Sequence, residues 1–196
     1  MKSNRLENFP ANSFIHFDLD GTLLDTTSAN ISSYREAVTS VGGIWTQAAS
    51  RLVLNGMGSE DFLKKCLDVD SHQYGEIRRR KIEIYPSKFE EVQPIGPVFD
   101  LLENVSPRAA LVTSASREST FLLLTHFGLL SYFSHIITAS DLKTNKPSPE
   151  GYLKSKMLAE TMWGGNLTHL AVEDSAVGSK AATAAGMLVL DAHSLF

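Results

Sequence analysis

The stretch "FIHFDLDGTLLDTT", residues 14–27, places a short apolar run directly before a group of aspartates. An unbroken run of apolar and aromatic residues is typical of a buried strand. Asp18 and Asp20 follow that run at once, and Asp25 comes shortly after them. Because Asp-Gly between hydrophobic residues is also a strong turn signal, Asp20-Gly21 on its own favours a hairpin. The choice between a simple turn and a chemical site therefore depends on the rest of the chain.

Composition and charge exclude several classes of protein. The 196 residues are 43% hydrophobic and 20% charged, which suits one large domain or a core with a smaller insert. A net charge of −4 without a long basic run argues against binding to nucleic acid or to anionic membranes. The most basic cluster, residues 78–81, is interpreted as the solvent-exposed face of a helix. The single cysteine, Cys66, excludes an intramolecular disulfide.

The N-terminal residues lack an apolar leader, and no run of the sequence is long enough to span a bilayer. We therefore expect a cytoplasmic protein.

Short apolar runs recur along the chain and predict the strands of one sheet. They are residues 14–17, 109–112, 135–138, 170–172 and 187–190. Because these runs are apolar on both faces, they indicate a parallel sheet covered by helices on both sides. The helices are predicted over residues 117–128, 148–162 and 175–186, with Ser148 and Ser175 as N-caps. This alternation predicts an open, Rossmann-like α/β fold.

The interval after the first strand has a different pattern. Residues 28–93 offer amphipathic helices over 29–42, 59–69 and 72–85 but no convincing central strand. Turn-forming segments flank the interval on both sides. We therefore expect an α/β core made of residues 1–27 and 94–196, with a small helical cap, residues 28–93, inserted after the first strand.

Polar residues follow the predicted strands, and ligands of open α/β sheets bind beyond the carboxyl ends of the strands. These residues are Asp18, Asp20, Thr113, Ser114, Lys146, Glu173 and Asp174. Carboxylates without imidazole or thiolate suit Mg²⁺, which prefers a few carboxylates together with water and substrate phosphate. A lysine and a hydroxyl would neutralise and hydrogen-bond phosphoryl oxygens. The strand ends thus indicate a site for magnesium and a phosphate ester.

Four motifs in order resemble those of the haloacid dehalogenase superfamily, in its branch of phosphatases and phosphomutases with a helical cap. They are "FIHFDLDGT", "AALVTSAS", "KPSPEGY" and "AVEDSAVGSKAATAAGM". The resemblance covers essentially the whole chain and is to the branch that includes phosphoglycolate phosphatase and β-phosphoglucomutase.

The resemblance implies a role for each matched residue. Asp18 would be the nucleophile that forms an aspartyl phosphate, and Asp20 would protonate the leaving oxygen and later accept a proton from water. Mg²⁺ would be held by Asp18, the backbone carbonyl of Asp20 and Asp174, with Glu173 as a direct or water-mediated ligand. Gly21 would let the chain turn beneath the phosphate.

The resemblance also implies a set of phosphate-binding groups. Thr113 and Lys146 would hold the phosphoryl oxygens as charge develops. Ser114 is an alternative for the hydroxyl, although Thr113 better fits the strand end. We also expect the backbone N–H groups of Leu19 and Ser114 to contribute.

Three functions remain open at this point. A Mg²⁺-dependent phosphatase for a small phosphorylated metabolite, acting as a monomer or homodimer, is favoured. A sugar phosphomutase with the same chemistry is the first alternative, and a non-catalytic binding protein is less favoured because the set of site residues is intact. A dehalogenase is disfavoured because enzymes of that activity lack the second aspartate of the first motif, here Asp20.

Substrate-contacting residues are harder to assign. Ser59 stands where the family's hexose-phosphate mutases carry an arginine for the distal phosphate, and Arg51, Lys64 or Lys65 could substitute for it. Arg117, at the start of the helix after the second motif, could reach the leaving group of the substrate. A solvated first-turn arginine is the simpler interpretation of Arg117.

Overall fold

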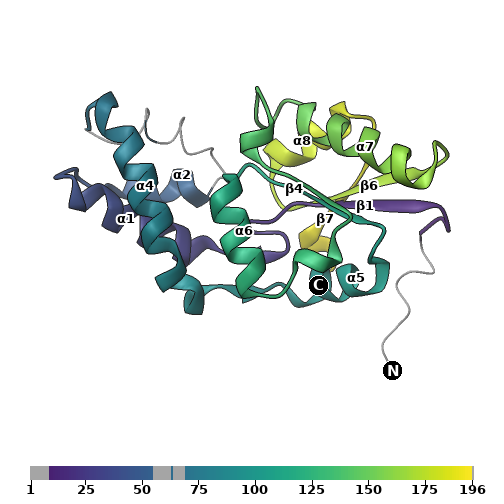
Figure 1. Ribbon diagram of the computed structural model, residues 1–196, viewed down its shortest axis with the longest axis horizontal. Helices are drawn as coiled ribbons and strands as arrows, with labels where there is room; N and C mark the ends of the chain where they lie inside the picture. Colours follow the sequence, from purple (N-terminus) through teal and green to yellow (C-terminus); the bar gives the residue numbers. More distant parts are fainter. Residues whose placement is uncertain (1–8, 55–62, 64–68, 196) are drawn as a thin grey trace.

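The structure, a computed structural model, describes residues 9–54, 63 and 69–195 (Figure 1). Its centre is a parallel five-stranded sheet with strand order β5-β4-β1-β6-β7. The strands are β1 Ser13–Phe17, β4 Ala109–Val112, β5 His135–Ile137, β6 Thr168–Glu173 and β7 Leu188–Asp191. The prediction of an open α/β fold with these strands is confirmed, and each predicted run overlaps an observed strand.

Strand β1 lies at the middle of the sheet because both of its edges are paired. Ile15 is in register with Ala109 of β4 on one side and with Leu170 of β6 on the other. Residues 14–17 are all buried, which explains why the sequence of this strand shows no polar alternation. The two residues that follow β1 are therefore held at the centre of the carboxyl edge of the sheet.

Helices cover both faces of the sheet (Figure 1). On one face, α5 Gly96–Val105 and α6 Arg117–His126 share a hydrophobic cluster with Ile15 and Phe17. On the other, α7 Glu150–Trp163 and α8 Ala176–Ala184 contribute to a cluster with Val112 and Ile137. The sequence analysis did not predict α5, because its opening Gly96-Pro97 resembles a chain breaker, although proline is well tolerated in the first helical turn.

The two predicted N-caps have different outcomes. Ser175 caps α8, since its hydroxyl oxygen accepts a hydrogen bond from the N–H of Gly178 at 3.0 Å. The prediction of Ser148 as the N-cap of α7 was wrong by one residue. Pro149 occupies that position, because its carbonyl already accepts the first helical bond, from the N–H of Leu153 at 2.9 Å.

The helical part of the chain lies at one end of the molecule (Figure 1). It contains α1 Thr27–Ser40, α2 Gln47–Leu54 and α4 Tyr74–Ile84, followed by a 3₁₀ segment, Tyr85–Glu91. A short 3₁₀ turn, Ser71–Gln73, precedes α4. These helices have a hydrophobic cluster of their own, formed by Ala37, Val38, Ala49, Leu63 and Ile77. The helix predicted over 59–69 lies, apart from Leu63 and Val69, outside the described residues, as does Cys66.

The chain enters and leaves this helical part through two short paired strands. β2 Leu24–Asp25 and β3 Gln93–Pro94 are antiparallel, with Leu24 in register with Pro94. The expected turn at Asp20-Gly21 is present, and Gly21 has φ +80°. A simple hairpin, the alternative considered for these residues, is not formed, because the strand after the turn pairs with β3 and not with β1.

Within the described part of the chain, no helix is long and apolar enough to cross a membrane.

Candidate active site

The parallel strands bring the predicted polar residues to one edge of the sheet. The N–H of Asp18, just after β1, donates to the carbonyl of Val172 on β6 at 3.0 Å. The ammonium of Lys146 donates to the carbonyl of Val112, the last residue of β4, at 2.9 Å. Three neighbouring strands therefore place Asp18, Lys146, Glu173 and Asp174 together.

Lys146 lies between two carboxylates. Its Nζ is 2.6 Å from Oδ1 of Asp18 and 2.6 Å from Oε1 of Glu173, and its side chain is only 9% exposed. Burial alone lowers the pKa of Lys146, but the charge of Asp18, with smaller contributions from Tyr152 and Glu173, raises it well above its usual value. The lysine therefore stays charged and can balance anionic groups in this buried place.

Asp18 is the carboxylate at the centre of the group. Burial raises the pKa of the Asp18 carboxyl well above its usual value; Lys146 acts in the opposite direction, and Glu173 acts in the same direction as burial. One ammonium thus compensates the buried negative charge incompletely. A further cation beside Asp18 would favour the ionised carboxylate that a nucleophile requires.

Three carboxylates are arranged as metal ligands would be. Asp18, Glu173 and Asp174 each offer an oxygen, and these atoms all lie within 4.8 Å of one another. The hydroxyl of Thr22 donates to Oδ1 of Asp174 at 3.0 Å and orients it. A Cβ at Gly21 would lie 2.4 Å from Oδ2 of Asp174, so only glycine leaves room for this carboxylate. An all-oxygen set of this kind fits Mg²⁺.

Glu173 is the most enclosed of these carboxylates, with 1% of the residue exposed. Its Oε1 accepts from Lys146 and from the hydroxyl of Tyr152 at 2.5 Å, and its Oε2 accepts from Ser175 at 3.2 Å. A Cβ at Gly178 would lie 1.9 Å from Oε2 of Glu173. The first turn of α8 can therefore approach Glu173 only because residue 178 is glycine.

Asp20 is directed away from the three-carboxylate group. Its Oδ1 accepts hydrogen bonds from the hydroxyl of Thr26 at 2.5 Å and from the side-chain amide of Asn30 at 3.1 Å. Sequence reasoning missed both partners. Thr26 reads as an ordinary N-cap of α1, but its side chain makes no capping bond to the helix and binds Asp20 instead.

Lys81 corrects the interpretation of residues 78–81 as a wholly exposed helix face. Its side chain is buried, with Nζ 3.3 Å from the hydroxyl of Ser119 on α6 and 3.5 Å from the ring centroid of Tyr85. Burial lowers the pKa of Lys81 to about 8, with Asp20 acting in the opposite direction. Residues 78–80 do lie at the surface, where Arg79 and Arg80 pair with Glu76.

The hydroxyls after β4 differ in their surroundings. Thr113 is 2% exposed, and its Oγ1 accepts from the N–H of Ala115 at 3.0 Å. Ser114 is partly exposed. The hydroxyl of Thr113 therefore stabilises the loop after β4, whereas the side chain of Ser114 is accessible to solvent or to a ligand.

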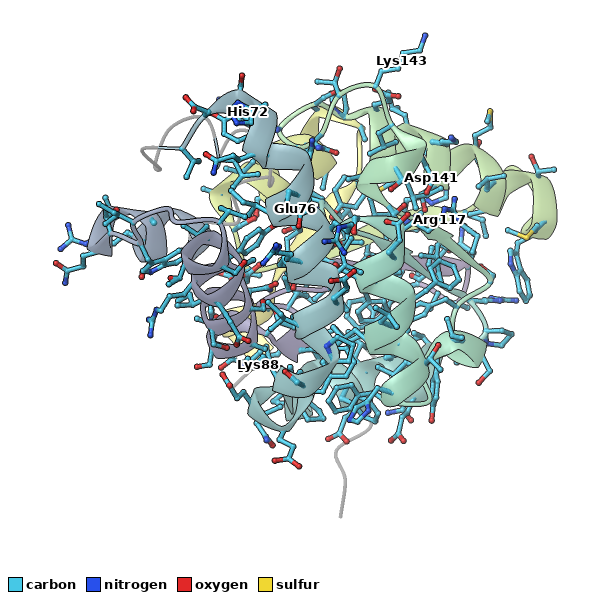
Figure 2. All side chains as sticks on the ribbon, turned by 60° about the vertical axis from the view of Figure 1, so that its left-hand side comes forward. His72, Glu76, Lys88, Arg117, Asp141 and Lys143 are labelled. Carbon is cyan, nitrogen blue, oxygen red and sulfur yellow. The ribbon has the colours of Figure 1, made fainter. Side chains whose placement is uncertain are left out.

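In the part of the chain that the structure describes, the predicted substrate-contacting residues do not lie together. Arg117 opens α6 and donates to Oδ1 of Asp141, and Figure 2 shows the two side chains next to each other. Asp141 in turn accepts from the N–H and the hydroxyl of Thr138 at 2.9 and 2.7 Å. Arg117 thus already has a role in bracing a loop, and its contact with a substrate stays a prediction. Ser59, Lys64 and Lys65 lie outside the described residues, and Arg51 is exposed.

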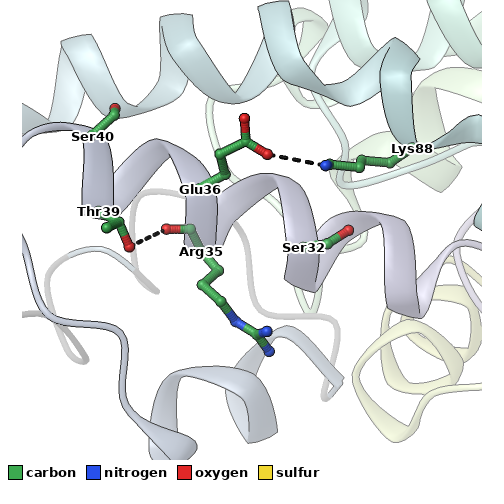
Figure 3. Close-up of a pocket in the computed structure, with 6 residues that line it drawn as sticks. All are labelled: Ser32, Arg35, Glu36, Thr39, Ser40 and Lys88. Atoms are coloured by element: carbon green, nitrogen blue, oxygen red, sulfur yellow. Dashed lines mark hydrogen bonds and ion pairs between the residues drawn. The ribbon is translucent and has the colours of Figure 1, made fainter.

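An open hollow of about 470 Å³ lies along α1, beside the 3₁₀ segment Tyr85–Glu91 (Figure 3). It is lined by Ser32, Arg35, Glu36, Thr39, Ser40 and Lys88. Lys88 pairs with Glu36 at 3.0 Å, and the hydroxyl of Thr39 donates to the carbonyl of Arg35 at 2.8 Å. Since Lys88 and Glu36 neutralise each other and none of the predicted site residues lines this hollow, the strand ends are the better candidate for a site of chemistry.

A parallel α/β sheet with carboxylates and a lysine at its strand ends is typical of an enzyme that binds an anionic substrate there, and such carboxylates are of the kind that could hold a metal ion. A family model described as haloacid dehalogenase-like hydrolase matches residues 15–192, and the protein belongs to this family. The resemblance expected from the four motifs is confirmed.

Two individual relatives are phosphatases by name, which agrees with the family. The fructose-1-phosphate phosphatase YqaB of Escherichia coli is 29% identical over 187 residues, which cover 91% of this chain and 95% of that protein. A phosphorylated carbohydrates phosphatase of Thermotoga maritima is 25% identical over 176 residues, covering 87% and 80% of the two chains. With this family and these relatives, the prediction of a phosphoric monoester hydrolase is confirmed.

A solved structure supports the fold. CbbY from Rhodobacter sphaeroides, crystallised with phosphate, superimposes with a TM-score of 0.74 at 24% sequence identity, covering 89% of this chain and 83% of that chain.

Proposed function

We propose that the protein is a Mg²⁺-dependent phosphatase that hydrolyses a small phosphorylated sugar through an aspartyl-phosphate intermediate. The observation that carries the proposal is the position of Lys146, whose ammonium lies between Asp18 and Glu173 at the carboxyl edge of the sheet. An oxygen of Asp174 lies close enough to those of Asp18 and Glu173 for the three carboxylates to share a metal ion. The sugar is inferred from the relatives, two of which are phosphatases of phosphorylated carbohydrates by name.

The donor set assigns the residues that would hold the metal. These are the carboxylates of Asp18 and Asp174, with the backbone carbonyl of Asp20 and, directly or through water, Glu173. Bound Mg²⁺ supplies positive charge that stabilises the transferring phosphoryl group. Thr22 and Gly21 support this arrangement by orienting Asp174 and by leaving room for it.

The chain's own residues carry the chemical steps. The carboxylate of Asp18 attacks phosphorus, and the bond between phosphorus and the sugar oxygen breaks. Asp20 gives its proton to that oxygen, so that a neutral alcohol leaves. Water then attacks the phosphorus of the aspartyl phosphate while Asp20 takes its proton, which releases phosphate and restores Asp18.

Lys146 and the hydroxyls after β4 stabilise the phosphoryl oxygens. The ammonium of Lys146 is already aimed at Asp18, so it meets the developing negative charge without reorganisation. Thr113 or Ser114 would donate a hydroxyl hydrogen bond, and the N–H groups of Leu19 and Ser114 would add backbone donors.

The helical part, residues 28–93, would act as a cap that excludes water during the reaction. Its paired connecting strands β2 and β3 lie next to Asp20, and the bonds from Thr26 and Asn30 tie Asp20 to the start of α1. A movement of the cap would therefore also change the position of the general acid.

The experiment that tests this function is phosphate release from a panel of sugar phosphates, with Mg²⁺ and with EDTA, by wild type and Asp18→Asn. We expect release that requires Mg²⁺ and is abolished by Asp18→Asn. Equal release by the variant would contradict the mechanism. An isomeric sugar phosphate without free phosphate would show a phosphomutase instead.

A further inference from the structure

Tyr152, on α7, contacts the buried pair formed by Lys146 and Glu173. The tyrosine itself is fully buried. Its hydroxyl donates to Oε1 of Glu173 at 2.5 Å, and Nζ of Lys146 lies 5.1 Å from the centroid of its ring. One side chain thus touches both members of the Lys146–Glu173 pair.

The fold brings Tyr152 to this place through a close approach of α7 to the sheet. A Cβ at the neighbouring Gly151 would lie 3.1 Å from Leu142 and 3.2 Å from Val112, so the helix backbone passes very near the end of β4. The ring of Tyr152 joins the hydrophobic cluster that contains Val112 and Ile137. Phenylalanine would fill that space equally well, and only the hydroxyl reaches the polar site.

The hydroxyl completes the hydrogen bonding of a buried carboxylate. Oε1 of Glu173 accepts from Lys146 and Tyr152, and Oε2 accepts from Ser175. Donors on both oxygens fix the rotation of the carboxylate, and a buried ion pair keeps one geometry only when its remaining positions are satisfied. Loss of the Tyr152 hydroxyl would leave Lys146 as the single donor to Oε1, so the carboxylate would be held less firmly and the alignment of Lys146 with Asp18 would loosen.

We propose that Tyr152 is a positioning residue: its hydroxyl fixes Glu173, and through Glu173 it holds the ammonium of Lys146 against Asp18 and the transferring phosphoryl group. This inference rests on the proposed phosphatase function for its kinetic effect. Its effect on the affinity for phosphate can be measured without turnover.

The test compares Tyr152→Phe with Tyr132→Phe, which loses the same atom in the short 3₁₀ segment Leu130–Tyr132, before the amino end of β5 and thus at the edge of the parallel sheet opposite the site. We expect Tyr152→Phe to lower kcat about tenfold with little change in KM, and to weaken the binding of inorganic phosphate measured by calorimetry in the presence of Mg²⁺. Tyr132→Phe should match wild type in both. Circular dichroism and a thermal melt report whether each variant is folded.

A double-mutant cycle with Glu173→Gln separates positioning from simple support of the fold. If Tyr152 acts through Glu173, Tyr152→Phe lowers kcat and phosphate affinity in wild type but has little further effect in the Glu173→Gln background. Equal losses in both backgrounds would overturn the proposal. Should Tyr152→Phe fail to fold, Ser175→Ala removes another donor to the same carboxylate and should show the same dependence on Glu173.

The two possible failures can be told apart. Absence of phosphate release by wild type from every ester would contradict the proposed function. Unchanged phosphate affinity of Tyr152→Phe, or unchanged kcat in an active enzyme, would overturn the role of Tyr152.

Discussion

At the scale of single residues, Lys146 compensates two buried carboxylates at once. Removing one partner of a buried ion pair leaves an unpaired charge, which costs more than the pair itself contributes. The same ammonium is positioned to stabilise the phosphoryl group. Its loss should therefore affect both the stability of the fold and the rate of the reaction.

We expect Lys146→Met, which keeps most of the side-chain stem, to lower the free energy of unfolding by about 3–5 kcal/mol without Mg²⁺. It should lower kcat by about 100-fold or more. Urea unfolding and phosphate release are the measurements, and Lys143→Met, an exposed lysine on the same loop, is the matched control. Wild-type turnover in Lys146→Met would contradict its assignment.

The two hydroxyls after β4 can be separated by substitution. Thr113→Val removes the acceptor used by the N–H of Ala115 and should lower both stability and activity. Ser114→Ala should lower activity alone if its hydroxyl binds phosphate, and neither property if Thr113 supplies the hydroxyl. Steady-state kinetics and thermal melts of the two variants, measured side by side, decide which residue fills this role.

At the scale of elements, α8 and the end of β6 are in close contact at Gly178. A side chain there would overlap Glu173, whose Oε2 lies 1.9 Å from the position of a Cβ. We expect Gly178→Ala to displace Glu173 and to lower stability and kcat together. Gly75→Ala is the control, because a Cβ at Gly75 of α4 meets nothing within 4 Å, and alanine should slightly stabilise that helix. Wild-type kinetics in Gly178→Ala would contradict the contact.

Helix α4 meets α6 through the buried Lys81, and this contact predicts a pH dependence of stability. Burial lowers the pKa of Lys81 from 10.5 to about 8, so between these pH values the unfolded chain binds more protons than the folded chain. The contribution of Lys81 therefore makes folding more favourable as pH rises from about 8 to 10.5, by up to about 3 kcal/mol.

Urea unfolding of wild type and Lys81→Met between pH 7 and pH 10 checks this prediction. The free energy of unfolding of wild type, relative to that of Lys81→Met, should increase as pH rises through about 8. A difference that stays constant with pH would show that burial does not lower the pKa of Lys81 in the folded protein. The far-UV spectrum of the variant serves to confirm that the helices remain.

For the whole molecule, the sheet and its carboxyl edge could be predicted from the sequence because both depend on local patterns. Each strand contains a short apolar run, and the residue after the strand is fixed by position in the chain. The helix α5 could not be predicted, because Gly96-Pro97 has the local chemistry of a turn and its helical state depends on the packing of Val98, Leu101 and Leu102 on the sheet.

The parts of the site that sequence reasoning missed are contacts between distant segments. Tyr152 and Glu173 are 21 positions apart, and Lys81 and Ser119 are 38 apart. Thr26 and Asn30 resemble an ordinary helix start, and their role becomes visible only when Asp20 is found to bond to them. The tertiary fold determines such partners, and a local sequence pattern does not reveal them.

Binding of the metal should raise the free energy of unfolding of the whole molecule. A ligand that binds only the folded chain raises the free energy of unfolding in proportion to the logarithm of its concentration. We expect Mg²⁺ to raise the melting temperature of wild type and to have little effect on Asp174→Asn. An equal rise in both proteins would place the metal away from the three carboxylates.

The most direct test of the central claim is to trap the aspartyl phosphate on Asp18. Wild type, mixed with its best sugar phosphate and Mg²⁺, is quenched with borohydride, which reduces an acyl phosphate of aspartate to homoserine, and the peptides are examined by mass spectrometry. We expect homoserine at position 18 only when substrate and Mg²⁺ are both present, and none in Asp18→Asn. Reduction at another residue, or rapid turnover by Asp18→Asn, would contradict it.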